Sequence, residues 1–158
     1  RTSMFRLSGL TLVILVAGAV GIISLLQPVV AADEPANVIK YRKELMKASA
    51  HHITNIFSVL KGDTSYSGHI AANARAISDS AAMMIDIFPE GSGEGNTRAL
   101  PSIWQNWPKF EAAAMALKTA ADDLASASGT GDMTTIGTAA GAVGKACGGC
   151  HEPFRKKK

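Results

Sequence analysis

The only two cysteines of this chain lie near its C-terminus and are followed at once by a histidine, as Cys147-Gly-Gly-Cys150-His151. Two thiols at this spacing with an adjoining imidazole form the attachment signature of c-type haem. The thiols would form thioether bonds to the porphyrin vinyl groups, and the imidazole would bind the iron as its proximal ligand. The motif therefore predicts one covalently bound haem c, attached at Cys147 and Cys150, with His151 on the iron.

The same two thiols are also compatible with a redox dithiol or a disulfide. A redox C-x-x-C motif belongs at a helix N-terminus inside a βαβ unit. No strand pattern precedes Cys147, and the residue after Cys150 is His. This setting favours haem attachment.

Four segments with helical patterning must position these residues, and breaks rich in Gly, Ser or Asp separate them. Asn37 and Asp132 are candidate N-caps of the first and fourth segments. Four helices with mostly short connections predict an all-α fold, an antiparallel four-helix bundle with the haem near one end. The segments span residues 38–60, 68–88, 102–127 and 133–157, and the longest connection is 89–101.

The N-terminal part of the chain carries a long apolar stretch. Leu7–Leu26 has no charged residue and is long enough to span a bilayer as a helix. The arginines before it favour a cytoplasmic N-terminus. We therefore expect residues 1–32 to form a transmembrane anchor, and residues 33–158 to form a haem domain on the periplasmic side of the bacterial inner membrane. A signal peptide cleaved at Val30-Ala31-Ala32 is the alternative.

Helix geometry indicates which side chains lie opposite the haem motif. An ideal helix advances about 100° per residue, which places Met46 and Arg42 on one apolar stripe of the first segment. By the same count His51 should face water, and His52 lies near the edge of the stripe. Met46 is thus a candidate distal ligand of the iron, with plain core packing as its other role. Arg42 would bind a haem propionate or extend to the surface at the bundle end.

Composition and motifs argue against several other functions. The net charge is only +3, and the short basic tail at residues 155–158 does not make a nucleic-acid surface. No set of nucleophile and base is visible, so we do not expect an enzyme. His51 and His52 are adjacent on a helix and point about 100° apart, which does not suit a shared metal ion.

Beyond the haem motif, the chain resembles the class II cytochromes c, the cytochrome c′ family, over about residues 38–158. The resemblance implies the four-helix bundle and its C-terminal haem. Four stretches carry it: Ile39-Lys40-Tyr41-Arg42, Val59-Leu60-Lys61-Gly62, Leu100-Pro101-Ser102-Ile103-Trp104, and Cys147–Lys158 with its aromatic residue and Arg after the His.

The resemblance implies roles for matching positions. Met46 stands where the distal haem residue lies, which binds the iron in low-spin members and only packs over it in five-coordinate members. Arg42 matches the Arg close to a propionate, and Arg155 matches the basic residue of the proximal pocket. Typical members are soluble periplasmic proteins whose signal peptide is removed. Members often pair through their first two helices, which suggests a homodimer.

With a retained anchor, the sequence predicts a membrane-tethered c-type cytochrome that carries single electrons between respiratory or photosynthetic complexes. The expected partners are the membrane and a redox complex such as a quinol–cytochrome reductase, a terminal oxidase or a photosynthetic reaction centre. The alternative is a five-coordinate protein of the cytochrome c′ type that binds NO or CO. In that alternative Met46 packs above the iron without binding it.

Overall fold

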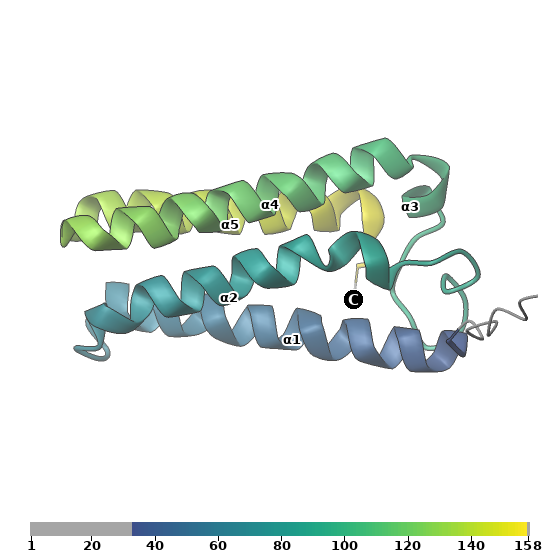
Figure 1. Cartoon of the computed structure of the whole chain (residues 1–158), viewed down its shortest axis with the longest axis horizontal. Coiled ribbons are helices and arrows are strands. Elements are labelled where there is room, and N and C mark those ends of the chain that lie inside the picture. The colour runs from purple at the N-terminus through teal and green to yellow at the C-terminus, as the bar shows by residue number, and fades with distance from the viewer. Residues whose placement is uncertain (1–32, 158) are drawn as a thin grey trace, which may run out of the picture. The chain divides into compact units, whose positions relative to one another are not determined.

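The computed structural model describes residues 33–157 of the chain. Four long helices lie side by side and alternate in direction, so the predicted antiparallel four-helix bundle is confirmed (Figure 1). One short helix precedes the third long one. The helices are α1 (Pro35–Leu60), α2 (Ile70–Ala82), α3 (Ser102–Gln105), α4 (Trp107–Ala127) and α5 (Met133–Phe154).

The two ends of the haem-bearing helix follow from local chemistry. Asp132 is the N-cap of α5, as predicted, because its carboxylate accepts the backbone N–H groups of Thr134 and Thr135. The helix ends at Phe154, earlier than the predicted residue 157. Arg155 takes an extended conformation and pairs with Ala99 instead.

Prolines explain where the other helix bounds differ from the prediction. Pro35 occupies the first turn of α1, where its missing N–H costs nothing, and the helix therefore begins before Asn37. The prediction of Asn37 as the N-cap is thus wrong. Similarly, Pro108 lies in the first turn of α4, and the third predicted segment is divided at Asn106 into α3 and α4.

The second predicted segment is also divided: a short 3₁₀ turn at Met84–Ile87 follows α2.

Buried side chains form two apolar clusters that meet at the haem motif. The first runs along the bundle, and Cys147 packs against it. The second lies at the end that carries α3, and Cys150 belongs to it. The first cluster comprises Ile56, Ile70, Ala74, Ile77, Ala81, Met84, Ala114, Leu117, Ala121, Leu124, Ile136, Ala140 and Val143. The second comprises Ala99, Ile103, Phe110, Cys150 and Phe154.

Residues 1–32, with the apolar stretch Leu7–Leu26, lie outside the described residues, so the division of the chain near residue 32 stays a prediction. Between residues 33 and 157, none of the helices combines the length and apolar character needed to cross a bilayer.

A polar contact joins α2 to α4 beside the core. The buried Ser78 donates to Asp122 Oδ1 at 2.5 Å, and Lys118 Nζ lies 2.7 Å from Asp122 Oδ2. Hydrogen bonds from Lys118 and then from Ser78 hold the pKa of the Asp122 carboxyl below its ordinary value. The ionised carboxylate is therefore the form that the fold prefers.

We expect Asp122→Asn to lower the free energy of unfolding near neutral pH and to have little effect in acid. A carboxyl whose pKa is lower in the folded state stabilises the fold above its unfolded-state pKa of about 4. That contribution is lost as the pH falls through the folded-state pKa. Denaturant unfolding from about pH 7 down to about pH 2 measures the difference, with Asp123→Asn as the neighbouring control. A difference that does not change with pH would contradict this assignment.

Candidate haem-binding site

The last turns of α5 bring the predicted attachment residues together. Cys147 is half-buried, Cys150 is buried and His151 is half-buried. Cys147 and His151 are four residues apart and lie on one face of the helix, one turn from each other. The backbone N–H of Arg155 donates to the His151 carbonyl at 3.1 Å, which closes the helix directly after the motif.

The environment of the two thiols does not fit a redox dithiol. Both cysteines are free. Burial, with the neighbouring Cys147 as a second cause, raises the pKa of the Cys150 thiol to about 11. Burial also raises the pKa of the Cys147 thiol. A redox dithiol depends on a lowered thiol pKa, so the structure gives no support to that alternative.

His151 is surrounded by groups that favour its neutral form. Burial lowers the pKa of its imidazole, and the positive charges of Arg155 and Arg98 lower it further. Neutral imidazole is the form that binds metal ions.

On α1, Met46 is the candidate distal residue that lies among apolar side chains. It is half-buried and packs against the first cluster, as Cys147 does. His51 is exposed, as predicted. His52 Nδ1 lies 2.9 Å from Asn73 Oδ1 on α2. Neither histidine of α1 therefore competes with Met46 for a place beside the first cluster.

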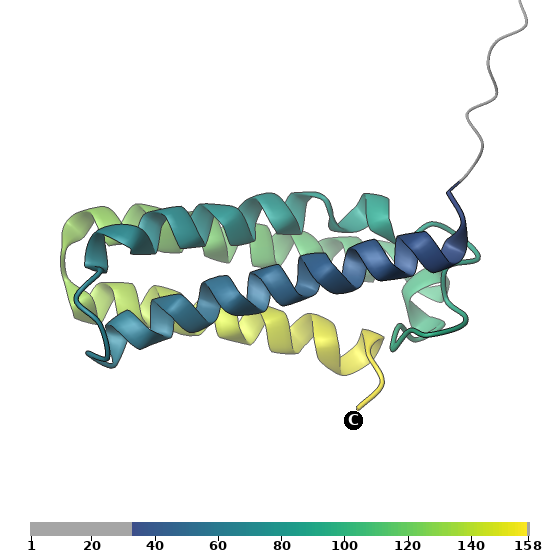
Figure 2. The same ribbon diagram turned by 90° about the horizontal axis from the view of Figure 1, so that it is seen from below.

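Glycines leave one side of the haem motif without side-chain bulk. In Figure 2, α1 and α5 diverge toward the end of the bundle at which α5 ends. Gly144 lies one turn before Cys147, and a Cβ added there would meet no other atom within 4 Å. Gly148 lies one turn further along α5, and a Cβ added there would also meet no other atom within 4 Å.

Arg42 is a buried cation that has no anionic partner among residues 33–157. It is only 3% exposed, and burial lowers the pKa of its guanidinium. Its Nη1 donates to Ser92 Oγ at 2.8 Å, and its Nη2 donates to the Ser92 carbonyl at 2.5 Å and to Thr97 Oγ1 at 2.7 Å. The guanidinium carbon also lies 4.6 Å from the centre of the Phe88 ring.

All acceptors of Arg42 are uncharged, and no carboxylate within residues 33–157 lies within ion-pair distance of it. A buried charge is costly unless it is paired. A buried guanidinium one turn before Met46 therefore fits a cofactor that carries carboxylates, as haem does. The free thiols, the lowered pKa of the His151 imidazole and the absence of side-chain bulk at Gly144 agree with the same group.

Arg155 is exposed, and its charge acts on His151 and on both thiols. It thus lies close to the side of α5 for which the sequence predicts a proximal pocket. Arg98 also acts on His151, and Ser92 and Thr97 bind Arg42. Ser92, Thr97 and Arg98 were not predicted as site residues, because they lie in an irregular connection.

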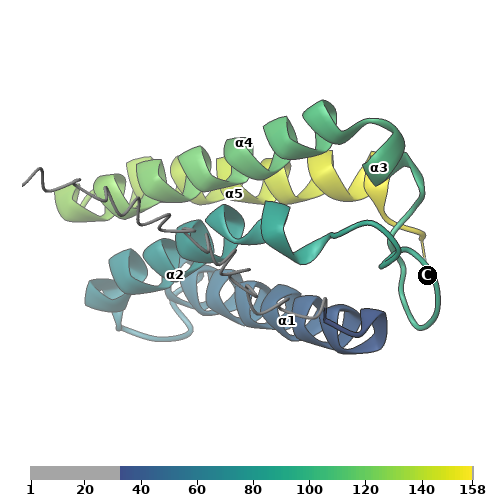
Figure 3. The ribbon, with the colours of Figure 1, turned by 45° about the vertical axis from the view of Figure 1, so that its right-hand side comes forward.

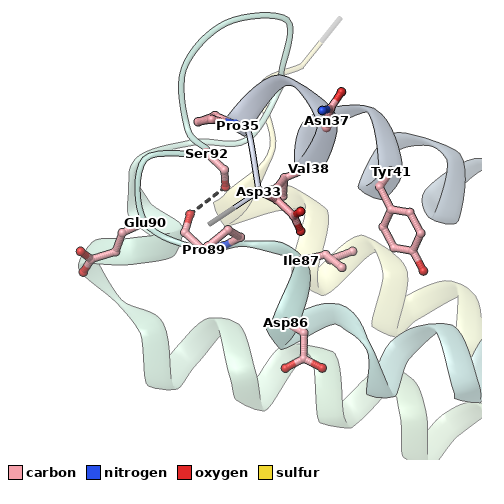
Figure 4. A pocket seen from close by; sticks show the side chains of 10 residues that line it. All are labelled: Asp33, Pro35, Asn37, Val38, Tyr41, Asp86, Ile87, Pro89, Glu90 and Ser92. Atoms are coloured by element: carbon pink, nitrogen blue, oxygen red, sulfur yellow. Dashed lines mark hydrogen bonds between the residues drawn. The ribbon is translucent and has the colours of Figure 1, made fainter. Parts of the chain in front are cut away.

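A groove with a volume of about 650 Å³ opens near the start of α1, and none of the predicted haem residues lines it (Figure 4). Its one link to the site is Ser92, which binds Arg42. The lining residues are Asp33, Pro35, Asn37, Val38, Tyr41, Asp86, Ile87, Pro89, Glu90 and Ser92.

Known proteins resemble this chain over the whole described bundle. The family model described as Cytochrome C′ matches residues 37–155. Cytochrome c′ of Pararhodospirillum photometricum is 35% identical over 123 residues, which cover 77% of this chain and 98% of the relative. A variant of cytochrome c prime from Alcaligenes xylosoxidans, solved as a nitric oxide complex, superposes with a TM-score of 0.73 at 29% identity, over 81% of this chain and 100% of its own. A further cytochrome c′, described as having an unusual ligand-controlled dimer dissociation, has a TM-score of 0.74 at 29% identity, over 80% of this chain and 100% of its own.

These relatives correct two predictions. They are named cytochromes c′, and one is solved as a nitric oxide complex. The prediction of a membrane-tethered carrier of single electrons is therefore wrong, as is the location at the inner membrane. The relatives also lend no support to a membrane, reductase, oxidase or reaction-centre partner. The alternative that binds NO or CO is better supported.

Proposed function

Because the chain belongs to the cytochrome c′ family, we propose that it binds nitric oxide or carbon monoxide at a five-coordinate haem iron. Its cofactor is the covalently bound c-type haem of this family. The relative solved as a nitric oxide complex supports the choice of ligand.

We assign the two thioether links to Cys147 and Cys150 and the proximal iron contact to His151. When bound, the haem supplies an iron atom that takes up the diatomic gas. Around it, the second cluster keeps water away from Cys150, and the cap at Arg155 holds the His151 end of α5 in place. Arg42 is proposed to bind a propionate, and Arg155 to line the proximal pocket.

The position of Met46 carries the proposal. Met46 is one of several apolar side chains of α1 that pack against the first cluster, as Cys147 does, while His51 is exposed and His52 is bonded to Asn73. A distal side formed by a thioether and its apolar neighbours accommodates a small, nearly apolar gas. On this distal side, no imidazole of α1 is placed to donate a hydrogen bond to the bound gas.

Ligation of the iron by Met46 stays a prediction from the sequence, and the optical spectrum of the ferrous protein tests it. We expect a broad high-spin spectrum without gas, saturable uptake of one CO per haem, and the same spectrum in Met46→Leu. Thioether ligation would instead give a sharp low-spin α-band that Met46→Leu removes. A ferrous spectrum that neither CO nor NO changes would refute the proposed function.

A homodimer is part of the proposal. The cytochrome c′ with ligand-controlled dimer dissociation supports it, and the exposed side chains of α1, among them His51 and Tyr41, are open to a second copy. Sedimentation of the haem-loaded protein over a range of concentrations measures this association.

A further inference from the structure

The connection from Phe88 to Ser102, which we call the strap, contacts both helices that carry the proposed haem ligands. It leaves the end of the 3₁₀ turn at Met84–Ile87 and enters α3. Figure 3 shows its loop beside the C-terminal end of the chain and near the start of α1. Besides the bonds that Trp104 Nε1 of α3 donates to the Phe88 and Pro89 carbonyls, the strap has one group of hydrogen bonds to α1 and another to the end of α5.

The first group holds Arg42 of α1. Ser92 is 1% exposed, and both its hydroxyl oxygen and its carbonyl oxygen accept hydrogen bonds from the guanidinium. The Ser92 hydroxyl in turn donates to the Pro89 carbonyl at 2.8 Å. The ring of Phe88, where the strap begins, lies against the same guanidinium. This half of the strap is therefore built around a side chain one turn before Met46.

The second group holds the residues that directly follow His151. The backbone N–H of Lys156 donates to the Arg98 carbonyl at 2.8 Å, and that of Leu100 donates to the Phe154 carbonyl at 3.0 Å. Ser102 Oγ donates to the Pro153 carbonyl at 2.7 Å. The bridge between Ala99 and Arg155 lies between these bonds.

Thr97 joins the two groups. Its hydroxyl oxygen accepts Arg42 Nη2 at 2.7 Å and the backbone N–H of Ala99 at 3.1 Å. One side chain thus bonds both to the helix of Met46 and to the residue that pairs with Arg155.

We propose that Ser92 and Thr97 are positioning residues for gas binding. They fix Arg42, and with it the turn of α1 that carries Met46, relative to the end of α5 that carries His151. The spacing of these two side chains then sets how closely Met46 approaches the iron and how fast a gas binds. This inference rests on the proposed function.

The chemistry of Arg42 makes the coupling strong. Hydrogen bonds from a charged donor are stronger than neutral ones, and a buried donor that loses its acceptor pays the full cost of desolvation. Loss of the Thr97 hydroxyl therefore forces Arg42, Ala99 or both to move. Shifts of about half an ångström are enough to change the performance of a binding site.

The test compares Thr97→Val, which removes the hydroxyl at nearly constant shape, with Thr97→Ser, which keeps it. Thr54→Val is the control, because Thr54 is exposed and its hydroxyl donates to the Ala50 carbonyl within α1. In the haem-loaded protein, we expect Thr97→Val to speed amide exchange at Leu100 and Lys156 about fivefold, as for one lost hydrogen bond. We also expect it to change the CO association rate about threefold or more. Thr97→Ser and Thr54→Val should match the parent both in amide exchange at Leu100 and Lys156 and in the CO association rate.

Unchanged exchange at Leu100 and Lys156 in Thr97→Val would overturn the inference. So would faster exchange with an unchanged CO rate and ferrous spectrum, because the strap would then support only the fold. If the parent protein binds neither CO nor NO, the proposed function fails. The inference is then still decided by comparing amide exchange at Leu100 and Lys156, and the ferrous spectrum, between Thr97→Val and the parent. Ser92→Ala, which removes the other hydroxyl, gives the same comparison if Thr97→Val does not fold.

Discussion

Replacing Cys147 and Cys150 together with Ser is expected to yield a protein whose intact mass equals that of the bare polypeptide. A serine hydroxyl does not replace the thiol in the thioether bonds, so no covalent link to the porphyrin forms. The parent chain, produced with a working cytochrome maturation system, should carry the added mass of one haem. Mass spectrometry under denaturing conditions makes the measurement, because it removes any haem that is held without a covalent bond.

The single variants Cys147→Ser and Cys150→Ser are the matched controls, since each leaves one thiol for attachment. A double variant that keeps the added mass would show that the link is formed elsewhere. A parent protein with the mass of the bare polypeptide would refute the covalent haem itself.

Phe110→Ala is expected to lower the free energy of unfolding by about 3–5 kcal/mol, the usual cost of a fully buried Phe. Phe110 is 2% exposed and lies at the centre of the second cluster. Its ring centre lies 4.8 Å from that of Phe88, 5.4 Å from that of Trp107 and 5.4 Å from that of Phe154. Removal of the ring leaves a cavity between the strap, α4 and the end of α5.

Denaturant unfolding of the haem-loaded protein measures this loss, and Met115→Ala is the control on the same helix. Met115 is 47% exposed, and we expect its replacement to cost about 0.5 kcal/mol or less. Equal losses for the two variants would contradict the central place of Phe110 in the second cluster.

Helical periodicity was enough to predict the bundle, the exposure of His51 and the apolar setting of Met46. Each of these depends on the spacing of apolar residues within one helix. The start of α1 was not predicted, because Asn37 and Pro35 are both acceptable near a helix N-terminus. The division at Asn106 likewise has no signal in the apolar pattern.

The contacts of the strap were beyond prediction for a different reason. Ser92 and Thr97 lie in an irregular connection, and their partner Arg42 is far away in the sequence. The contact exists only once the bundle brings α1 and the strap together. The functional prediction rested on residues 1–32 as a membrane anchor and on Met46 as an iron ligand. It was wrong because an apolar N-terminal stretch and a Met at the distal position are equally compatible with a gas-binding member of the family.

The separations in sequence across the strap have a consequence for the order of folding. Arg42 and Ser92 are 50 residues apart, Ser102 and Pro153 are 51 apart, and Arg98 and Lys156 are 58 apart. Contacts that close such long loops carry a larger entropy cost and slow the folding of a chain. The contacts of the strap should therefore form after helices that are adjacent in the sequence have paired. Both thiols then stay accessible to the attachment machinery until a late stage of folding.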